Sequence, residues 1–177
     1  NHDPKYFAKN GYCVFPRVFS HAEVESNRRL LDEATDKGML DRDSYLGEPH
    51  TRDERWLEIC RHPKLLDAVQ SVLGPNLILV YSSVFIKPPR SVETVPWHQD
   101  NTYWPSVHGT DVVTVWLAID DADPENSAMM VIPESHVSYR ECATVPSDAH
   151  EMLSKKIVVT SAMEARAVSL QMTAGSV

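Results

Sequence analysis

The stretch Asp111–Asp120, with the sequence DVVTVWLAID, decides the fold class. Within it, branched aliphatic side chains occupy every second position from Val113 to Ile119. Successive side chains of a strand point to opposite faces, so a period of two predicts a β-strand with one face toward a core.

Other segments of the second half of the chain have the same character. Residues 77–87, 128–132 and 167–171 are short and rich in residues that favour strands. Several strands of this length, joined by turn-rich connections with few helices between them, predict an antiparallel sandwich or barrel. We therefore expect a double-sheet β-fold supported by helices.

The first 76 residues show helical signals instead. A short segment ends at Asn10–Gly11, where glycine suits a helix C-cap, and the apolar run Tyr12–Phe15 after it predicts a strand. Ser20–Glu23 has the pattern of a capping box, which predicts the start of a helix. Between Pro63 and Pro75, apolar residues repeat at helical spacing.

Composition excludes several kinds of partner. With 17 basic and 25 acidic residues, the net charge of −8 repels phosphate backbones and acidic membrane surfaces, so we expect neither nucleic acid nor a membrane as partner. No apolar run approaches the roughly 20 residues of a membrane helix, and the N-terminus lacks a signal pattern, so we expect a cytoplasmic protein. The three cysteines match neither a zinc ribbon nor a disulfide framework. The sequence does not determine the oligomeric state.

The stretch Pro96–Asp100, with the sequence PWHQD, offers ligands for a metal. On a strand, the period of two would place His98 and Asp100 on the same face. A histidine and a carboxylate, joined by a second histidine, form the facial triad of non-haem iron(II) oxygenases. The tripeptide His98-Gln99-Asp100 alone is weak evidence for a metal site. Such a sequence often arises by chance, and its histidine and aspartate can simply form a hydrogen-bonded pair at the surface.

Further motifs stand around the tripeptide in a definite order. They are Phe7-x-x-x-Gly11-Tyr12, the helix from Ser20, His62-Pro63-x-Leu65-Leu66, Phe85-x-Lys87-Pro88-Pro89, Tyr103-Trp104, Val115–Asp121 and Val131–His136. In this order they resemble the phytanoyl-CoA dioxygenase family over nearly the whole chain. The ordered set carries the resemblance, since no single motif decides it.

The resemblance implies a fold and a reaction. The fold would be mainly β with N-terminal helices: a double-stranded β-helix (jelly roll, cupin-like) in a single domain, with a helical support region at 1–76 and the jelly-roll core at 77–177. His98 and Asp100 would hold Fe(II), 2-oxoglutarate would chelate it, and O2 would take the last position. The family's reaction would hydroxylate a small-molecule substrate and release succinate and CO2.

Four further residues are candidates for contact with 2-oxoglutarate. By position, Ser83 and Trp116 are similar to residues that contact this co-substrate in the family, and Gln99 lies inside the ligand tripeptide. Lys87 would suit a carboxylate anchor. A structural role also explains them: Trp116 as a core aromatic, Ser83 as an ordinary strand residue, and Lys87 as a solvated cation at a strand end.

The sequence departs from the family pattern in two ways. Where the family often has glycine, this chain has Ser127 and Glu134, which would be strained if the backbone φ there is positive. Met172–Val177 resembles the turn before the strand that delivers the family's distal histidine. We therefore expect that histidine, and the arginine that pairs with 2-oxoglutarate, beyond Val177, and the jelly roll to be incomplete at the C-terminus.

Two other classes of function fit part of the pattern. A non-catalytic jelly-roll binding domain would explain a metal site with two ligands. A zinc-dependent cupin-like hydrolase or isomerase would need more histidine and cysteine ligands than the sequence places. Halogenation is disfavoured, because related halogenases replace the carboxylate that Asp100 supplies here.

Overall fold

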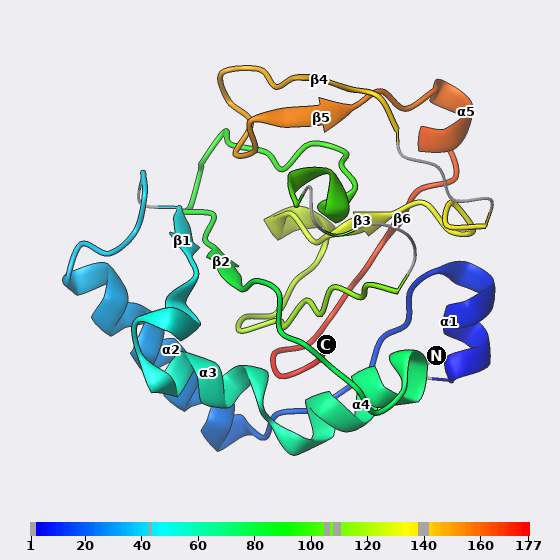
Figure 1. Ribbon diagram of the computed structural model, residues 1–177. Helices are drawn as coiled ribbons and strands as arrows, with labels where there is room; N and C mark the ends of the chain where they lie inside the picture. The colour runs from blue at the N-terminus through cyan, green and yellow to red at the C-terminus, as the bar shows by residue number, and fades with distance from the viewer. Residues whose placement is uncertain (1–2, 43, 105–106, 108–110, 138–141) are drawn as a thin grey trace.

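A computed structural model describes residues 3–42, 44–104, 107, 111–137 and 142–177 (Figure 1). The helices of this part are α1 (Pro4–Asn10), α2 (His21–Asp36), α3 (Glu54–Cys60), α4 (Pro63–Leu73) and α5 (Ser161–Glu164), with short 3₁₀ helices η1 (Pro49–Thr51), η2 (Asp100–Tyr103) and η3 (Pro124–Asn126). Its strands are β1 (Tyr45–Gly47), β2 (Ser83–Phe85), β3 (Met130–Val131), β4 (Thr144–Pro146), β5 (Lys155–Ile157) and β6 (Val168–Ser169). Helices α2, α3 and α4 lie along one side of the molecule, and the strands lie beside and above them (Figure 1).

The predicted helix signals are confirmed. Glu23 N donates to Ser20 Oγ over 3.4 Å and Ser20 N donates to Glu23 Oε2 over 2.7 Å, so both halves of the capping box of α2 are present. Gly11 ends α1 with φ +80°, and Gly74 caps α4. Helix α3 was not predicted from the sequence, although Asp53 caps it in the same way as Asp3 caps α1.

Substitution of Ser20 by alanine should destabilise the protein by about 1 kcal/mol, because a backbone N–H at the start of α2 loses its acceptor. The pKa of Glu23 is lowered from 4.5 to about 2, mainly by the hydrogen bonds of its carboxylate with Ser20 and in addition by its contact with His62. A carboxyl whose folded pKa is depressed stabilises the protein above its unfolded pKa and stops doing so as the pH falls through the folded value. The difference in unfolding free energy between wild type and Ser20→Ala should therefore shrink between pH 4.5 and 2.

Chemical denaturation at a series of pH values measures this. Ser26→Ala, at an exposed position within α2, is the control and should not destabilise, because alanine favours helix interiors. A Ser20→Ala difference that stays constant down to pH 2 would contradict the coupling to Glu23.

The predicted long strands are not found in the described residues. Six strands of two or three residues form antiparallel pairs there: β1 with β2, β3 with β6, and β4 with β5. The segment predicted at 77–87 is a strand only at Ser83–Phe85, and Tyr12–Phe15 and the described Asp111–Asp120 are not strands. A strand needs a partner ladder as well as a period of two, and the local sequence specifies only the period.

The final segment, 172–177, takes the place of a partner strand. Phe15 and Val177 exchange backbone hydrogen bonds of 2.8 and 3.0 Å, and Ala118 N donates to Ser176 O over 3.0 Å. Gly175 N in turn donates to Ala118 O over 2.8 Å. The segment runs back through the middle of the molecule to end beside the helices (Figure 1), so it binds the DVVTVWLAID stretch to the N-terminal region.

Buried apolar side chains gather in three clusters among the described residues. They contain, in turn, Val18, Phe19, Val24 and Leu65; Leu30, Ala34, Leu46 and Trp56; and Ala118, Leu170 and Met172. Val177 packs against the first cluster and Met172 belongs to the third. The C-terminal segment therefore joins the core beneath the helices to the core of the β-region.

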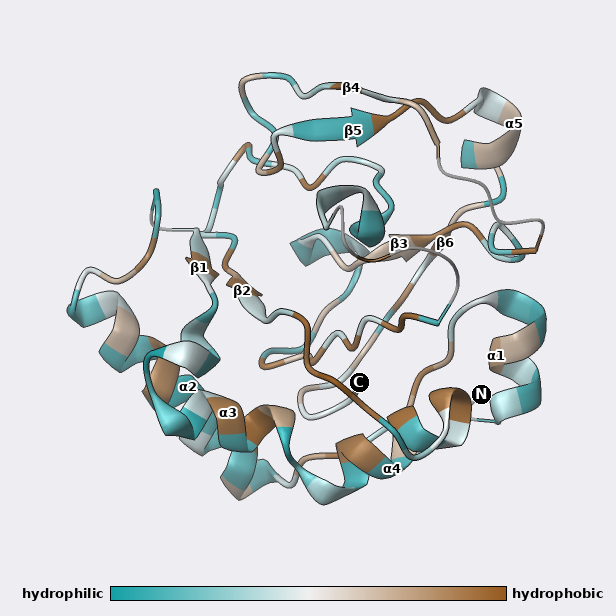
Figure 2. Ribbon diagram, in the orientation of Figure 1, coloured by the Kyte–Doolittle hydropathy of each residue, from teal (hydrophilic) through white to brown (hydrophobic). Residues whose placement is uncertain are grey.

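The connection between α4 and β2 is strongly hydrophobic (Figure 2), and Ile78 within it is 88% exposed.

Ser127 and Glu134, which stand where the family often has glycine, have φ of +71° and +64°. Both departures from the family pattern therefore fall where the backbone is left-handed. In the part of the chain that the structure describes, none of the helices has both the length and the hydrophobicity needed to cross a bilayer.

Candidate metal centre

His98 and Asp100 face one another, as the sequence predicted, although they do not lie on a strand. Asp100 is the first residue of η2, and His98 lies in the irregular segment before it. The residue between them, Gln99, has extended dihedrals (φ −115°, ψ 125°). One extended residue is enough to turn its two neighbours to the same side, so the period of two holds without a ladder.

Besides contacting each other, the side chains of His98 and Asp100 each form a hydrogen bond to a further residue. His98 Nε2 lies 3.0 Å from Asp100 Oδ1, and His98 Nδ1 lies 2.7 Å from the carbonyl oxygen of Pro96. A carbonyl can only accept, so Nδ1 donates a proton to Pro96, and Nε2 is the nitrogen turned to the carboxylate. Thr114 Oγ1 donates to Asp100 Oδ2, the other carboxylate oxygen. The two side chains are 29% and 32% exposed, which leaves them within reach of a small ligand.

Each member of the pair favours the charged form of the other. Burial acts to lower the pKa of His98, but its hydrogen bonds to Asp100 and Pro96 outweigh this and raise that pKa. Burial acts to raise the pKa of Asp100, and the hydrogen bonds from His98 and Thr114 outweigh it and lower that pKa. Both shifts favour an ionised Asp100 carboxylate facing Nε2, a position in which a metal cation could bind between the two atoms.

The pair fits a metal ion. Two donors that bind one ion at about 2.1 Å and at right angles stand about 3.0 Å apart, and this is the separation of Nε2 and Oδ1. A histidine ligand usually donates its second ring N–H to a carbonyl or carboxylate, as His98 does to Pro96. Iron(II) is one of the divalent metals that one histidine nitrogen and one carboxylate oxygen can bind.

The third ligand is not found in the described residues, where no group of three or more histidine, cysteine, aspartate or glutamate side chains could hold a metal. His136 packs over Gly11, where an added Cβ would lie 2.5 Å from its Nδ1, and its Nε2 lies 2.9 Å from Ala8 O. The contacts of His136 are therefore those of a structural residue.

The candidates for 2-oxoglutarate contact lie on several elements. Ser83 begins β2 opposite Gly47, and burial lowers the pKa of Lys87 just beyond that strand. Gln99 Oε1 accepts from Cys142 N over 2.8 Å, and Trp116 packs against the third core cluster. No hydrogen bond or ring contact between described residues joins Ser83, Lys87 or Trp116 to the metal pair.

Sequence reasoning missed Thr114, which orients Asp100 from 14 residues away. Its place inside the alternating stretch gave it a strand position but no chemical role. A threonine at that position could be recognised only once the segment was known to lie against the metal pair.

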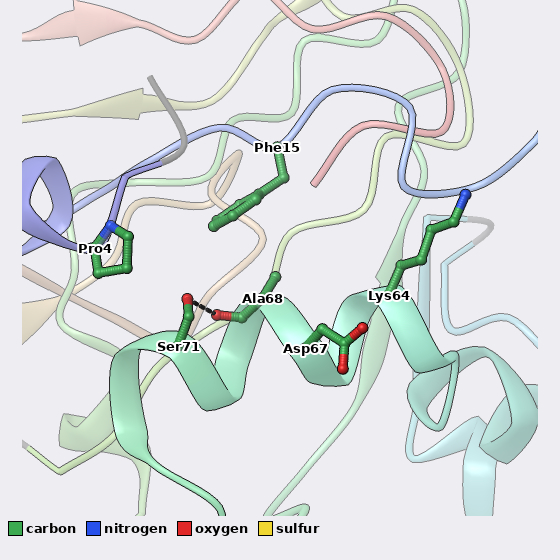
Figure 3. Close-up of a pocket in the computed structure, with 6 residues that line it drawn as sticks. All are labelled: Pro4, Phe15, Lys64, Asp67, Ala68 and Ser71. Atoms are coloured by element: carbon green, nitrogen blue, oxygen red, sulfur yellow. Dashed lines mark hydrogen bonds between the residues drawn. The ribbon is translucent and has the colours of Figure 1, made fainter.

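Two surface cavities lie elsewhere. One, of about 280 Å³, is lined by Pro4, Phe15 and one face of α4 (Figure 3). The other, of about 590 Å³, lies between α2 and the α3–α4 region. Neither is lined by His98 or Asp100.

A helix-supported β-fold with a histidine and a carboxylate held ready for one ion defines a candidate mononuclear metal protein. More particularly, the chain belongs to the phytanoyl-CoA dioxygenase (PhyH) family, whose model matches residues 7–177. The resemblance inferred from the ordered motifs is thereby confirmed.

Similar proteins include peroxisomal phytanoyl-CoA dioxygenase of Bos taurus, 23% identical over 155 residues, which cover 75% of this chain and 46% of the relative. Ectoine dioxygenase of Sphingopyxis alaskensis is 25% identical over 165 residues (85% and 54%). L-proline trans-4-hydroxylase of Streptomyces griseoviridis is 26% identical over 140 residues (73% and 52%). The chain thus spans about half the length of the curated relatives it matches.

A solved structure shares the fold. The epimerase SnoN, in complex with Fe3+, alpha ketoglutarate and nogalamycin RO, superposes with a TM-score of 0.67 at 16% sequence identity. The match covers 98% of this chain and 70% of SnoN. At this identity the likeness shows the fold alone.

Proposed function

We propose that this chain is part of an iron(II)- and 2-oxoglutarate-dependent oxygenase that hydroxylates a small organic substrate. The observation that carries the proposal is the His98–Asp100 pair, with Nε2 and Oδ1 3.0 Å apart and each side chain fixed by a second partner. Membership of the phytanoyl-CoA dioxygenase family supports it, as do relatives named as dioxygenases and a hydroxylase.

His98 and Asp100 would supply two of three protein ligands, with a histidine beyond Val177 as the third. Iron(II) with 2-oxoglutarate and O2 would supply the oxidising chemistry, with release of succinate and CO2. The chain would orient the ligands: the hydrogen bond to Pro96 fixes the imidazole ring so that Nε2 would face the ion, and the hydrogen bond from Thr114 to one carboxylate oxygen would leave the other oxygen for the ion.

The same proposal assigns the co-substrate contacts to Ser83, Gln99, Trp116 and Lys87. Lys87 has the best physical support, because burial lowers its pKa and a partly desolvated cation gains from a carboxylate partner. The architecture that would bring these residues together is the jelly-roll core at 77–177, supported by the helices of 1–76 in one domain.

The substrate class follows from charge and from the relatives. A net charge of −8 disfavours polyanionic partners such as nucleic acid. Relatives named for ectoine and L-proline point to small molecules. The shape of the pocket walls would select the particular molecule.

The test is an anaerobic titration of the full-length protein with Fe(II) and 2-oxoglutarate, followed by the weak visible charge-transfer band of the chelate. The expected result is a band that needs both additions, and succinate production once air is admitted. A full-length protein that shows neither would overturn the proposal and favour the non-catalytic binding domain.

Substitution of Thr114 by valine should weaken Fe(II) binding by about 10-fold or more, because partners behind a metal ligand commonly contribute that much. Valine keeps the shape of the side chain but cannot donate to Asp100 Oδ2. The dissociation constant from the anaerobic titration measures the effect.

The matched control is Thr144→Val, at an exposed position of β4, which should bind Fe(II) like the wild type. Equal affinities for Thr114→Val and the wild type would show that the Thr114 hydroxyl does not orient the carboxylate.

A further inference from the structure

The β4–β5 hairpin lies along the segment that carries the metal pair. At the open end of the hairpin, where Ile157 pairs with Thr144, Ile157 N donates to Trp97 O over 2.9 Å. Farther along, Thr94 N donates to His150 O over 3.0 Å and Met152 N donates to Thr94 O over 2.9 Å. The hairpin is therefore hydrogen-bonded to this segment on the N-terminal side of His98.

On the other side of the pair, one residue of the hairpin holds η2. Lys155 Nζ donates to the carbonyl of Thr102 and lies 4.9 Å from the centre of the Tyr103 ring. Tyr103 Oη donates to the carbonyl of Lys155. Lys155 is thus joined to η2 by a hydrogen bond to Thr102, by a hydrogen bond from Tyr103 and by a cation–π contact with the Tyr103 ring. The hydrogen-bonded residues are 52 and 53 positions apart in the chain.

This contact reaches the metal ligands through η2. The helix has only four residues, begins at Asp100 and ends at Tyr103. A single 3₁₀ turn has poor internal hydrogen bonds, so outside contacts decide how it is oriented. The Tyr103 ring also lies edge-on to the His98 ring, with centres 6.2 Å apart at 74°. A contact that fixes Tyr103 and Thr102 therefore constrains both members of the pair.

We propose that Lys155 is a positioning residue of the metal centre, which clamps η2 and so holds Asp100 and His98 in binding geometry. The role in metal binding rests on the proposed function, whereas the clamp itself does not. Lys155 does not reach the ion in this assignment. It acts through Thr102 and Tyr103.

The neighbouring lysine provides a matched control. Lys156 bonds Asp148 over 2.6 Å and Glu151 over 3.0 Å within the hairpin. Successive residues of a strand face opposite sides, so Lys155 faces η2 and Lys156 faces away from it. Lys156→Met removes the same charge from the same strand without touching the metal segment.

Two measurements on the full-length protein test the clamp. The first is amide hydrogen exchange of the metal-free protein over residues 98–104, which Lys155→Met should accelerate by about 10-fold or more while Lys156→Met leaves it unchanged. The second is the affinity for Co(II), which Lys155→Met should weaken by about 10-fold. Lys155→Arg should keep an affinity close to that of the wild type, because arginine retains the positive charge, the hydrogen-bond donors and the ability to stack on an aromatic ring.

Tyr103→Phe gives an independent variant, since it removes only the hydroxyl that binds the Lys155 carbonyl and should reproduce part of both effects. Unchanged exchange in Lys155→Met and Tyr103→Phe would overturn the clamp. Accelerated exchange with unchanged Co(II) affinity would overturn the link to the metal. A wild type that binds no Co(II) would count against the proposed function instead, and the exchange data would still decide whether Lys155 clamps η2.

Discussion

Replacement of His98 by alanine should lower the affinity of the full-length protein for Fe(II) by about 100-fold or more. Loss of a residue that supports a metal ligand already costs about 10- to 100-fold in affinity, and His98 is itself one of the two proposed ligands that the structure brings together. Methyl in place of imidazole leaves Asp100 as the only donor of the pair. The charge-transfer band of the 2-oxoglutarate chelate should disappear at Fe(II) concentrations that saturate the wild type.

The control for this substitution is His21→Ala, at the exposed first residue of α2. It should bind Fe(II) as the wild type does, so any loss in His98→Ala cannot come from the general removal of an imidazole. Circular dichroism should show both variants folded. Retention of the band in His98→Ala would remove His98 from the metal centre, and with it the main support for the proposed oxygenase.

The substitution Gly175→Ala should destabilise the protein by about 3 kcal/mol, through backbone strain together with overpacking. Gly175 has φ +84°, and a Cβ there would lie 2.6 Å from Phe19 O and 3.1 Å from a methyl of Val24. The carbonyl belongs to backbone and cannot swing aside as a flexible side chain would. The added methyl must therefore push apart the N-terminal segment and the C-terminal turn, which Phe19 N and Gly175 O join over 3.0 Å.

Gly38→Ala separates the strain from the clash. Gly38 also has a positive φ, of +64°, but a Cβ there meets nothing within 4 Å among the described residues. This control should cost about 1 kcal/mol, the cost of the left-handed conformation alone. Unfolding free energies from denaturant titration decide the matter, and equal losses in the two variants would show that residues 172–177 are not packed as described.

Local signals were predictable to the residue. The capping box at Ser20 and Glu23 and the glycine end of α1 depend on contacts between residues three or four positions apart, so the chain itself supplies both partners. The pairing of His98 with Asp100 was also predicted, although on a strand that does not exist there. The extended backbone of Gln99 alone places the two side chains on the same side.

The extent of the strands was not predictable in the same way. The alternation in Asp111–Asp120 says which side chains share a face, but it does not say which segment provides the ladder. In the structure Ala118 bonds to the turn at 175–176, and the long strands expected from the pattern do not form in the described residues.

The sequence alone placed the starts of α2 and α4, indicated the family to which the chain belongs, and singled out His98 and Asp100 as candidate metal ligands. Only the tertiary structure decided what holds those side chains in place: Thr114 behind Asp100, and Lys155 on the turn that follows it. The physical reason is distance along the chain. Contacts between residues 14 or 53 positions apart leave no trace in a local period, because they arise only when packing brings separate segments together.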